Sequence, residues 1–146
     1  ETFCHKIGAG FRTEAISGVA PETGLEEYWR NERYRIFHSV DGEVVTCHHV
    51  EDCIETWVWS TIQNFNPTLI HDRNKNVVRP FLTTSKADFI SWARRNDVPW
   101  IEDASNLDTR FTRNYIRHVA MPHVLHINPG IAKNVRKKII ERRCGQ

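Results

Sequence analysis

Residues 44–59, VVTCHHVEDCIETWVW, join a short β-branched run to a segment of helix-forming residues. The run predicts a strand over residues 43–47, and its unbroken apolar character is typical of a buried parallel strand. The residues that follow predict a helix over 51–63. A strand that leads into a helix is the repeating unit of α/β proteins. The stretch therefore predicts an α/β fold with a parallel sheet.

The remaining chain alternates between periodic segments and turn-rich segments. Apolar residues at helical spacing predict a helix over 25–40, and Ser85 with Asp88 predicts a capping box at the start of a helix that runs to about Arg95. Two further helices are expected over 107–119 and 131–142. Residues 11–17 have the composition of a strand, whereas residues 64–76 are expected to form a loop.

Bulk composition indicates one folded domain with a real core. The chain has 146 residues and is 40% hydrophobic, and no apolar run approaches the roughly 18 residues of a membrane span. The four cysteines lack C-x-x-C spacing, and the N-terminus ETFCHKIG has no signal-peptide pattern, so we expect reduced thiols in a cytoplasmic protein. The same N-terminal residues resemble the end of a helix stopped at Gly8, which predicts a chain that starts within a domain.

Positive charge is concentrated in the last quarter of the sequence. From residue 110 onward nine Lys or Arg oppose one acid, which gives +8 there and leaves −6 for the rest of a chain whose net charge is +2. The nine are Arg110, Arg113, Arg117, Lys133, Arg136, Lys137, Lys138, Arg142 and Arg143. A basic end on a near-neutral protein favours a polyanionic partner, although a solvated helix face explains it equally well.

Polar residues cluster where the first predicted strand ends. His48 and His49 follow that strand, and ligands of parallel sheets bind at this edge. Asp52 and Glu55 are three residues apart, so both project from one face of the next helix. These carboxylates suit Mg²⁺ or an amine nucleophile, or they serve only the helix dipole. A zinc site built from Cys47, the two histidines and Cys53 is disfavoured by geometry, so no resident metal is predicted.

A second polar segment, residues 98–124, carries regularly spaced arginines. Arg110, Arg113 and Arg117 fall at i, i+3 and i+7, which on a continuous helix forms one cationic stripe. Leu107, Phe111 and Tyr115 form an adjacent apolar stripe. Such a row of guanidinium groups binds phosphates or carboxylates, and an arginine-rich surface helix is the alternative.

The two segments together resemble one protein family. HHVEDCIET is similar to the HH-x-D-D-x-x-E-T segment of the PP-loop ATP pyrophosphatase superfamily, and residues 100–117 are similar to the W-x-E-D-x-S-N-x-D-x-R-F-x-R-N-x-I-R pattern of the tRNA(Ile)-lysidine synthetases. Further fragments that agree are Arg30, Arg33 and Tyr34, residues 78–82, and residues 127–129. The resemblance extends from about residue 1 to residue 129.

The resemblance implies a fold and a reaction. It implies a partial Rossmann-like parallel sheet of the PP-loop ATPase type over residues 1–82 and a helical tRNA- and substrate-binding extension over 83–146. It implies ATP- and Mg²⁺-dependent adenylation of C2 of the wobble cytidine in tRNA(Ile) with a CAU anticodon, followed by attack of L-lysine.

The resemblance also implies roles for individual residues. The catalytic positions are His48, Asp52 and Glu55, where the carboxylates bind and orient the lysine; the substrate-binding positions are Arg30, Arg33, Arg113, Asn114 and Arg117. The basic residues Arg110, Lys133, Arg136, Lys137, Lys138, Arg142 and Arg143 are then expected to contact tRNA.

The S-G-G-x-D-S loop, which cradles the ATP pyrophosphate in this family, does not occur in the sequence. The leading hypothesis is therefore the C-terminal part of a split or truncated synthetase, completed by a second polypeptide that carries the loop, or by a homo-oligomer. The alternatives are a catalytically inactive RNA-binding remnant and another PP-loop tRNA-modifying enzyme, such as a thiolase. The lack of cysteine pairs for an iron–sulfur cluster disfavours most thiolases.

Overall fold

The computed structural model describes residues 2–16, 18–64 and 67–145. The chain divides into two compact units, residues 1–42 and residues 43–146. Each unit is described by itself. No helix among the described residues combines the length and apolar character needed to cross a membrane.

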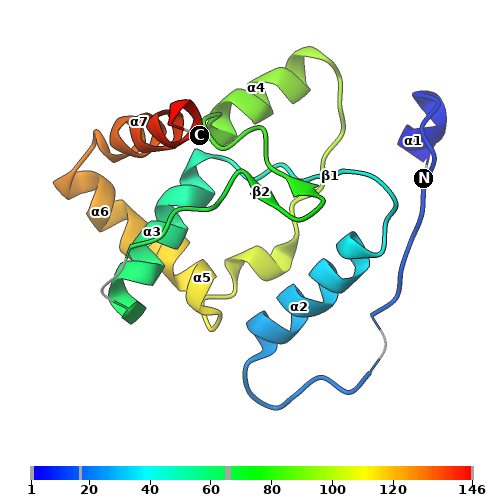
Figure 1. Ribbon diagram of the computed structural model, residues 1–146, viewed down its shortest axis with the longest axis horizontal. Coiled ribbons are helices and arrows are strands. Elements are labelled where there is room, and N and C mark those ends of the chain that lie inside the picture. Colours follow the sequence, from blue (N-terminus) through cyan, green and yellow to red (C-terminus); the bar gives the residue numbers. More distant parts are fainter. Residues whose placement is uncertain (1, 17, 65–66, 146) are drawn as a thin grey trace. The chain divides into compact units, whose positions relative to one another are not determined.

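The first unit contains two helices joined by an irregular segment. Helix α1 spans Thr2–Lys6 and ends before Gly8, whose φ of 70° stops it as predicted. Helix α2 spans Leu25–His38 and confirms the predicted helix to within two residues (Figure 1). Residues 11–16 form neither helix nor strand, so the expected strand is wrong over these positions, and its last residue, Ser17, lies outside the described residues.

The second unit holds a small mixed sheet. Its strands are β1 (Val44–Val45), β2 (Arg73–Asn74) and β3 (Val77–Val78), in the order β1-β3-β2. β1 pairs with β3 in parallel, and β2 pairs with β3 in antiparallel orientation. The α/β class and one parallel strand pair are therefore confirmed. A buried β1 is not, because Val45 is 56% exposed at the edge of the sheet.

Helices surround one apolar core in this unit. α3 (Val50–Asn64) packs against α7 (Ile131–Cys144) and against the π-helical turn η2 (Ile116–Ala120) (Figure 1). Six core residues lie at helical spacing on α3 and α7: Val50, Cys53, Ile54, Ile131, Val135 and Ile139. The other three are Leu82 before α4, Ile116 in η2 and Met121 in α6. Burial raises the pKa of the Cys53 thiol to about 12.

Helix α4 (Lys86–Arg95) shows the predicted capping box. The Ser85 side chain accepts a hydrogen bond from the Asp88 N–H, and the Asp88 carboxylate accepts one from the Ser85 N–H at 3.0 Å. Helix α7 likewise confirms the predicted helix over 131–142, with two further residues at its end. Local sequence signals therefore place α3, α4 and α7 correctly.

The predicted helix over 107–119 is wrong in its start and in its regularity. Residues 104–107 form the 3₁₀ turn η1 (Ala104–Leu107), α5 (Thr112–Tyr115) begins five residues late, and η2 then continues into α6 (Met121–Ile127). Pro122 lacks the N–H that a regular helix needs, and the wider π-helical turn precedes it. Leu107 and Tyr115 are 73% and 52% exposed, so the expected apolar stripe does not pack into the core.

Candidate functional site

The first two turns of α3 place two acids on one buried face. Asp52 and Glu55 are 8% and 5% exposed. The Asp52 carboxylate also accepts the His49 N–H at 2.9 Å, which caps the helix N-terminus where the dipole favours negative charge. Helix geometry explains the shared face, and the backbone bond from the Val50 N–H to the Thr84 carbonyl fixes the start of the helix.

Two arginines from α5 and η2 meet these acids. Arg113 Nη2 donates to Asp52 Oδ1 at 2.8 Å, and Arg113 Nε donates to Glu55 Oε2 at 3.3 Å. Arg117 Nε and Nη2 donate to the two Glu55 oxygens at 2.7 and 2.9 Å, and Nη2 also lies 3.3 Å from Asp52 Oδ1. We call Asp52, Glu55, Arg113 and Arg117 the acid–arginine cluster.

The cluster satisfies its buried carboxylates. Each of the four carboxylate oxygens accepts at least one hydrogen bond, and the cluster has no net formal charge. The hydrogen bond to Glu55 raises the pKa of Arg117 more than burial lowers it. Because the Arg113 side chain is 43% exposed against 28% for Arg117, Arg113 is the member most open to a ligand.

The histidines differ in their surroundings. His48 Nδ1 lies 2.9 Å from Thr46 Oγ1, a contact that orients the ring. His49 Nδ1 lies 3.0 Å from Glu51 Oε2, which also accepts the Lys86 N–H at 3.0 Å. Burial raises the pKa of Glu51. The hydrogen bonds from His49 and from backbone N–H groups together lower this pKa by more, so the net shift is downward. Glu51 is therefore a structural acid that joins α3 to α4.

Asn114 organises the loop before α5. Its amide donates to the Ser105 carbonyl at 2.9 Å and to the Asp108 carbonyl at 3.0 Å. Arg110 is bound by its neighbour Asp108 through bonds of 2.7 to 3.1 Å, and its side chain is 88% exposed. Arg110 is thus not in line with the other two arginines, and the predicted three-arginine stripe is wrong at this position because residue 110 precedes α5.

The predicted residues of the first unit lie on α2. The Arg30 guanidinium stacks over the Tyr34 ring at 5.1 Å from its centroid, and Arg33 is exposed. Their roles in substrate binding stay predictions.

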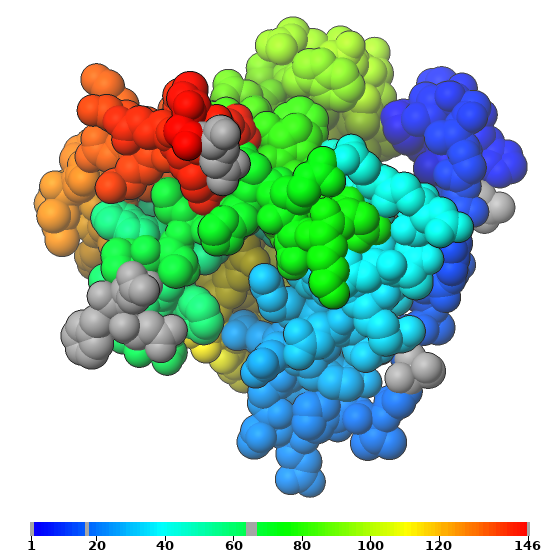
Figure 2. All heavy atoms as spheres, viewed as in Figure 1, coloured from blue at the N-terminus to red at the C-terminus, as the bar shows by residue number. Residues whose placement is uncertain are grey.

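The basic residues of α7 separate into two groups. Three bind within the second unit: Arg136 Nε donates to the Thr83 carbonyl at 2.9 Å, and Arg142 and Arg143 both donate to Asp72 at 2.6 Å. We call Asp72, Arg142 and Arg143 the α7 tether, and Figure 2 shows α7 in red beside the green segment. Lys133, Lys137 and Lys138 are exposed. The predicted tRNA-binding set therefore includes residues that also hold α7 in place.

Sequence reasoning missed Asp72 as a functional or structural residue. Burial raises its pKa, but the hydrogen bonds from Arg143 and Arg142 outweigh burial and hold the pKa below its usual range. Nothing in the sequence connects residue 72 with residues 142 and 143. A turn signal at Asn74–Asn76 was available for the β2–β3 hairpin, in which Lys75 has a φ of 52°.

Mg²⁺ was expected as a cofactor, and the side chains present do not fit a protein-held ion. Within residues 2–16, 18–64 and 67–145, no group of three or more His, Cys, Asp or Glu is arranged to bind a metal. The oxygens of Asp52 and Glu55 already accept from guanidinium groups, whereas Mg²⁺ requires near-octahedral oxygen ligands.

Comparison with known proteins decides the family. A family model described as a PP-loop domain matches residues 1–124, which include both the α3 acids and the cluster arginines. The chain belongs to the PP-loop domain family. The match confirms the resemblance to this family that the sequence motifs predicted. Proteins of this family use ATP.

Relatives of this PP-loop chain are tRNA-modifying enzymes. The tRNA(Ile)-lysidine synthase of Legionella pneumophila (strain Lens) is 33% identical over 147 residues, which cover 94% of this chain and 34% of the relative. The enzymes named tRNA(Ile)-lysidine synthase in Buchnera aphidicola (subsp. Acyrthosiphon pisum) and Lactiplantibacillus plantarum are 35% and 31% identical, covering 67% and 82% of this chain and 24% and 30% of those proteins. The chain spans about a third or less of the length of these relatives.

Proposed function

We propose that this chain forms part of a tRNA(Ile)-lysidine synthase, a carbon–nitrogen ligase that converts the wobble cytidine of a CAU anticodon to lysidine. The acid–arginine cluster carries the proposal. It joins the two sequence segments that resemble this enzyme family, although Asp52 and Arg113 are 61 residues apart in the chain. A tRNA substrate also implies a cytoplasmic location.

The proposed reaction has two steps. The C2 oxygen of cytidine attacks the α-phosphate of ATP, an O–P bond forms, and pyrophosphate leaves. The ε-amine of lysine then attacks C2, a C–N bond forms, the C–O bond to AMP breaks, and the amine proton passes to a base. Both steps build or move negative charge, which fixed guanidinium groups stabilise.

Each cluster residue has a proposed role in this reaction. Arg113, the more exposed arginine, binds an anionic group, either a phosphate or the lysine carboxylate. Asp52 and Glu55 position the arginines, and they bind and orient the lysine amine once Arg113 moves toward its anion. His48, whose ring is oriented by Thr46, is the proposed base for the amine proton because an imidazole nitrogen can accept a proton as a general base.

The pyrophosphate-binding loop is the part that residues 1–146 do not contain. We propose that an S-G-G-x-D-S segment, from the same polypeptide or from a second one, completes the ATP site. Glycine-rich loops bind phosphates through backbone N–H groups, which the cluster side chains do not replace. We also propose that residues 1–82 belong to the ATP-binding domain and that residues 83–146 contact the tRNA and the substrate.

Lysidine formation is the direct test. The chain, supplied with the loop segment, is incubated with ATP, lysine and a tRNA(Ile) transcript with a CAU anticodon, and nucleosides are analysed by mass spectrometry. We expect lysidine at the wobble position and none with a UAU anticodon. Arg117→Gln is expected to abolish the product. Arg73→Gln is a matched change outside the cluster, at an exposed arginine that pairs with Glu43, and is expected to keep it.

The exposed lysines of α7, Lys133, Lys137 and Lys138, favour a second candidate, an RNA-binding protein without catalysis. This candidate predicts that tRNA binding is insensitive to ATP and lysine, and that no lysidine forms with any loop segment. Lysidine formation that depends on Arg117 would exclude it.

A further inference from the structure

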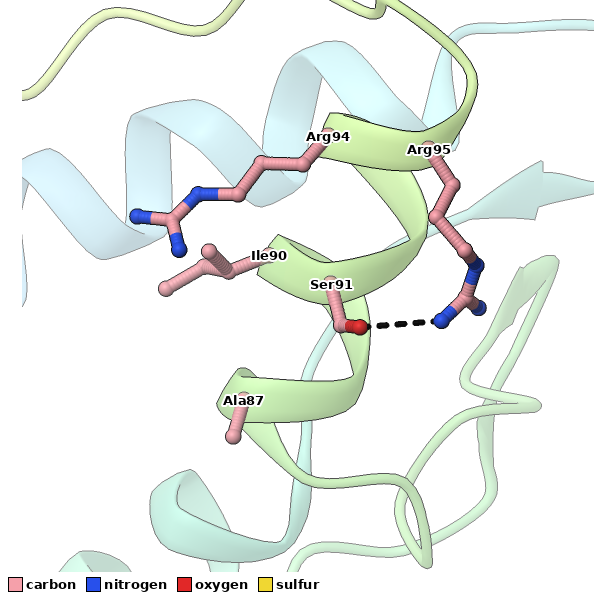
Figure 3. A pocket seen from close by; sticks show the side chains of 5 residues that line it. All are labelled: Ala87, Ile90, Ser91, Arg94 and Arg95. Atoms are coloured by element: carbon pink, nitrogen blue, oxygen red, sulfur yellow. Dashed lines mark hydrogen bonds between the residues drawn. The ribbon is translucent and has the colours of Figure 1, made fainter.

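The outer face of α4 has a depression that no residue of the acid–arginine cluster lines. Its lining residues are Ala87, Ile90, Ser91, Arg94 and Arg95. These positions recur at i, i+3, i+4, i+7 and i+8, so they share one face of the helix. Figure 3 shows Arg94 and Arg95 extending in different directions from the last turn of α4.

The two arginines carry charge that the described residues do not neutralise. Arg95 Nη1 donates to Ser91 Oγ at 2.9 Å, a bond to a neutral hydroxyl. Neither Arg94 nor Arg95 forms an ion pair with a carboxylate among the residues that the structure describes. The only acid of α4, Asp88, is used in the capping box. The face therefore keeps two positive charges available for an anion.

An aromatic surface adjoins these charges. The Arg94 guanidinium lies 6.0 Å from the centroid of the Trp100 ring, and Trp100 is 47% exposed. Trp92 on the same helix is 54% exposed, and neighbouring Ile101 is 96% exposed. Exposed aromatic rings next to basic side chains are typical of surfaces that bind single-stranded nucleic acid. Exposed indole rings beside guanidinium groups that have no carboxylate partner match a ligand that has both flat rings and regularly spaced anions.

We propose that residues 87–101 form a docking surface for single-stranded RNA, with Arg94 and Arg95 on successive phosphates and a base stacked on Trp100. Charge complementarity and the exposed rings support this occupant, because RNA offers both phosphates and stacking faces in one molecule. An acidic peptide would satisfy the arginines but would leave the indole rings without a stacking partner. The inference rests on the proposed function only in choosing the RNA strand, the anticodon loop of tRNA.

Binding of a fluorescent anticodon stem–loop RNA to the 146-residue chain tests the surface. Anisotropy is measured without ATP or lysine between about 50 and 200 mM salt. We expect Arg94→Gln with Arg95→Gln to raise Kd about tenfold or more, and to reduce the slope of log K against log salt by about 1.4, the value for two phosphate contacts on a single strand. Trp100→Ala is expected to raise Kd about fivefold or more, and Trp100→Phe to keep binding within about twofold of the unchanged protein.

Control variants separate a docking surface from general charge or misfolding. Lys6→Gln with Arg12→Gln removes the same charge from the other unit, and is expected to change Kd by less than about twofold. Circular dichroism checks that each variant is folded. The proposal is overturned if the α4 double variant and Trp100→Ala bind as tightly as the control, or if polyglutamate competes as well as RNA.

The two proposals fail in different ways. If Arg94→Gln with Arg95→Gln forms lysidine with an unchanged KM for tRNA, the docking surface is wrong and the enzyme assignment holds. If no lysidine forms but the variants lose RNA affinity, the surface holds and the enzyme assignment fails.

Discussion

Two pairs of arginines in the second unit bind carboxylates, and they do so in different environments. Arg113 and Arg117 meet two acids whose side chains are only 11% and 6% exposed. Arg142 and Arg143 share one acid, Asp72, whose side chain is 32% exposed. The carboxylates of the acid–arginine cluster are buried and the cluster is formally neutral, whereas the carboxylate of the α7 tether is partly exposed and the tether carries one excess positive charge.

The difference separates two uses of the same chemistry. A buried carboxylate that loses its partner leaves an uncompensated charge, so the cluster has little tolerance for change. A half-exposed carboxylate can exchange a lost partner for water, so the tether fixes α7 at a modest cost. The sequence predicted substrate binding for Arg113 and Arg117 and tRNA contacts for Arg142 and Arg143, but it did not predict the carboxylate that each pair binds.

Breaking the cluster has the largest expected effect. Glu55→Gln removes the charge that neutralises Arg117, and we expect it to lower the free energy of unfolding by about 3 kcal/mol. Urea denaturation followed by circular dichroism measures this change. Glu55→Gln is also expected to abolish lysidine formation.

Glu43→Gln is the matched control for that change. Glu43 pairs with Arg73, but both side chains are more than half exposed, so the expected loss is about 0.5 kcal/mol or less. Equal losses in the two variants would contradict the distinction between buried and open pairs.

Breaking the tether has the next largest expected effect. Asp72→Asn removes two charge-assisted hydrogen bonds, and its partial exposure limits the expected loss to about 1 to 2 kcal/mol. Urea denaturation again gives the value. Proteolysis near residue 144 should quicken in this variant because α7 loses its terminal anchor. A loss as large as that of Glu55→Gln would show that the tether is part of the core.

Lowering the pH should remove the stabilisation that the α7 tether gives to the folded protein. Because the pKa of Asp72 is lowered in the folded protein, its stabilisation is present above its unfolded pKa, and is lost as pH falls through the folded value. The difference in unfolding free energy between the protein and Asp72→Asn is expected to be constant from about pH 5 to 7 and to shrink below about pH 4. A difference that grows toward low pH would refute this assignment.

The exposed pair on α7 has the smallest expected effect. Lys137 Nζ and Glu141 Oε1 are 3.7 Å apart, and their side chains are 76% and 60% exposed. Lysine precedes glutamate at i, i+4, which is the weaker orientation. Glu141→Gln should therefore change the unfolding free energy by less than about 0.5 kcal/mol in low salt. A larger change would mean that Glu141 has a further partner.

The sequence predicted the elements whose signals are local. The bounds of α3, α4 and α7 follow from apolar spacing and from the Ser85–Asp88 cap, which involve residues within one or two turns of one another. The same periodicity failed between residues 107 and 119, because Pro122 and the Asp108–Arg110 bond override it.

The sequence by itself determined the family, the presence of α3, α4 and α7 to within two residues at each end, and the identity of the two acids and three arginines that form its motifs. Only the tertiary structure decided which charges meet. Asp52 and Glu55 take Arg113 and Arg117 but not Arg110, and Asp72 takes Arg142 and Arg143, over separations of 58 to 71 residues. Side-chain spacing within a helix sets which residues share a face, whereas packing of α3 against α7 and η2 sets which faces meet.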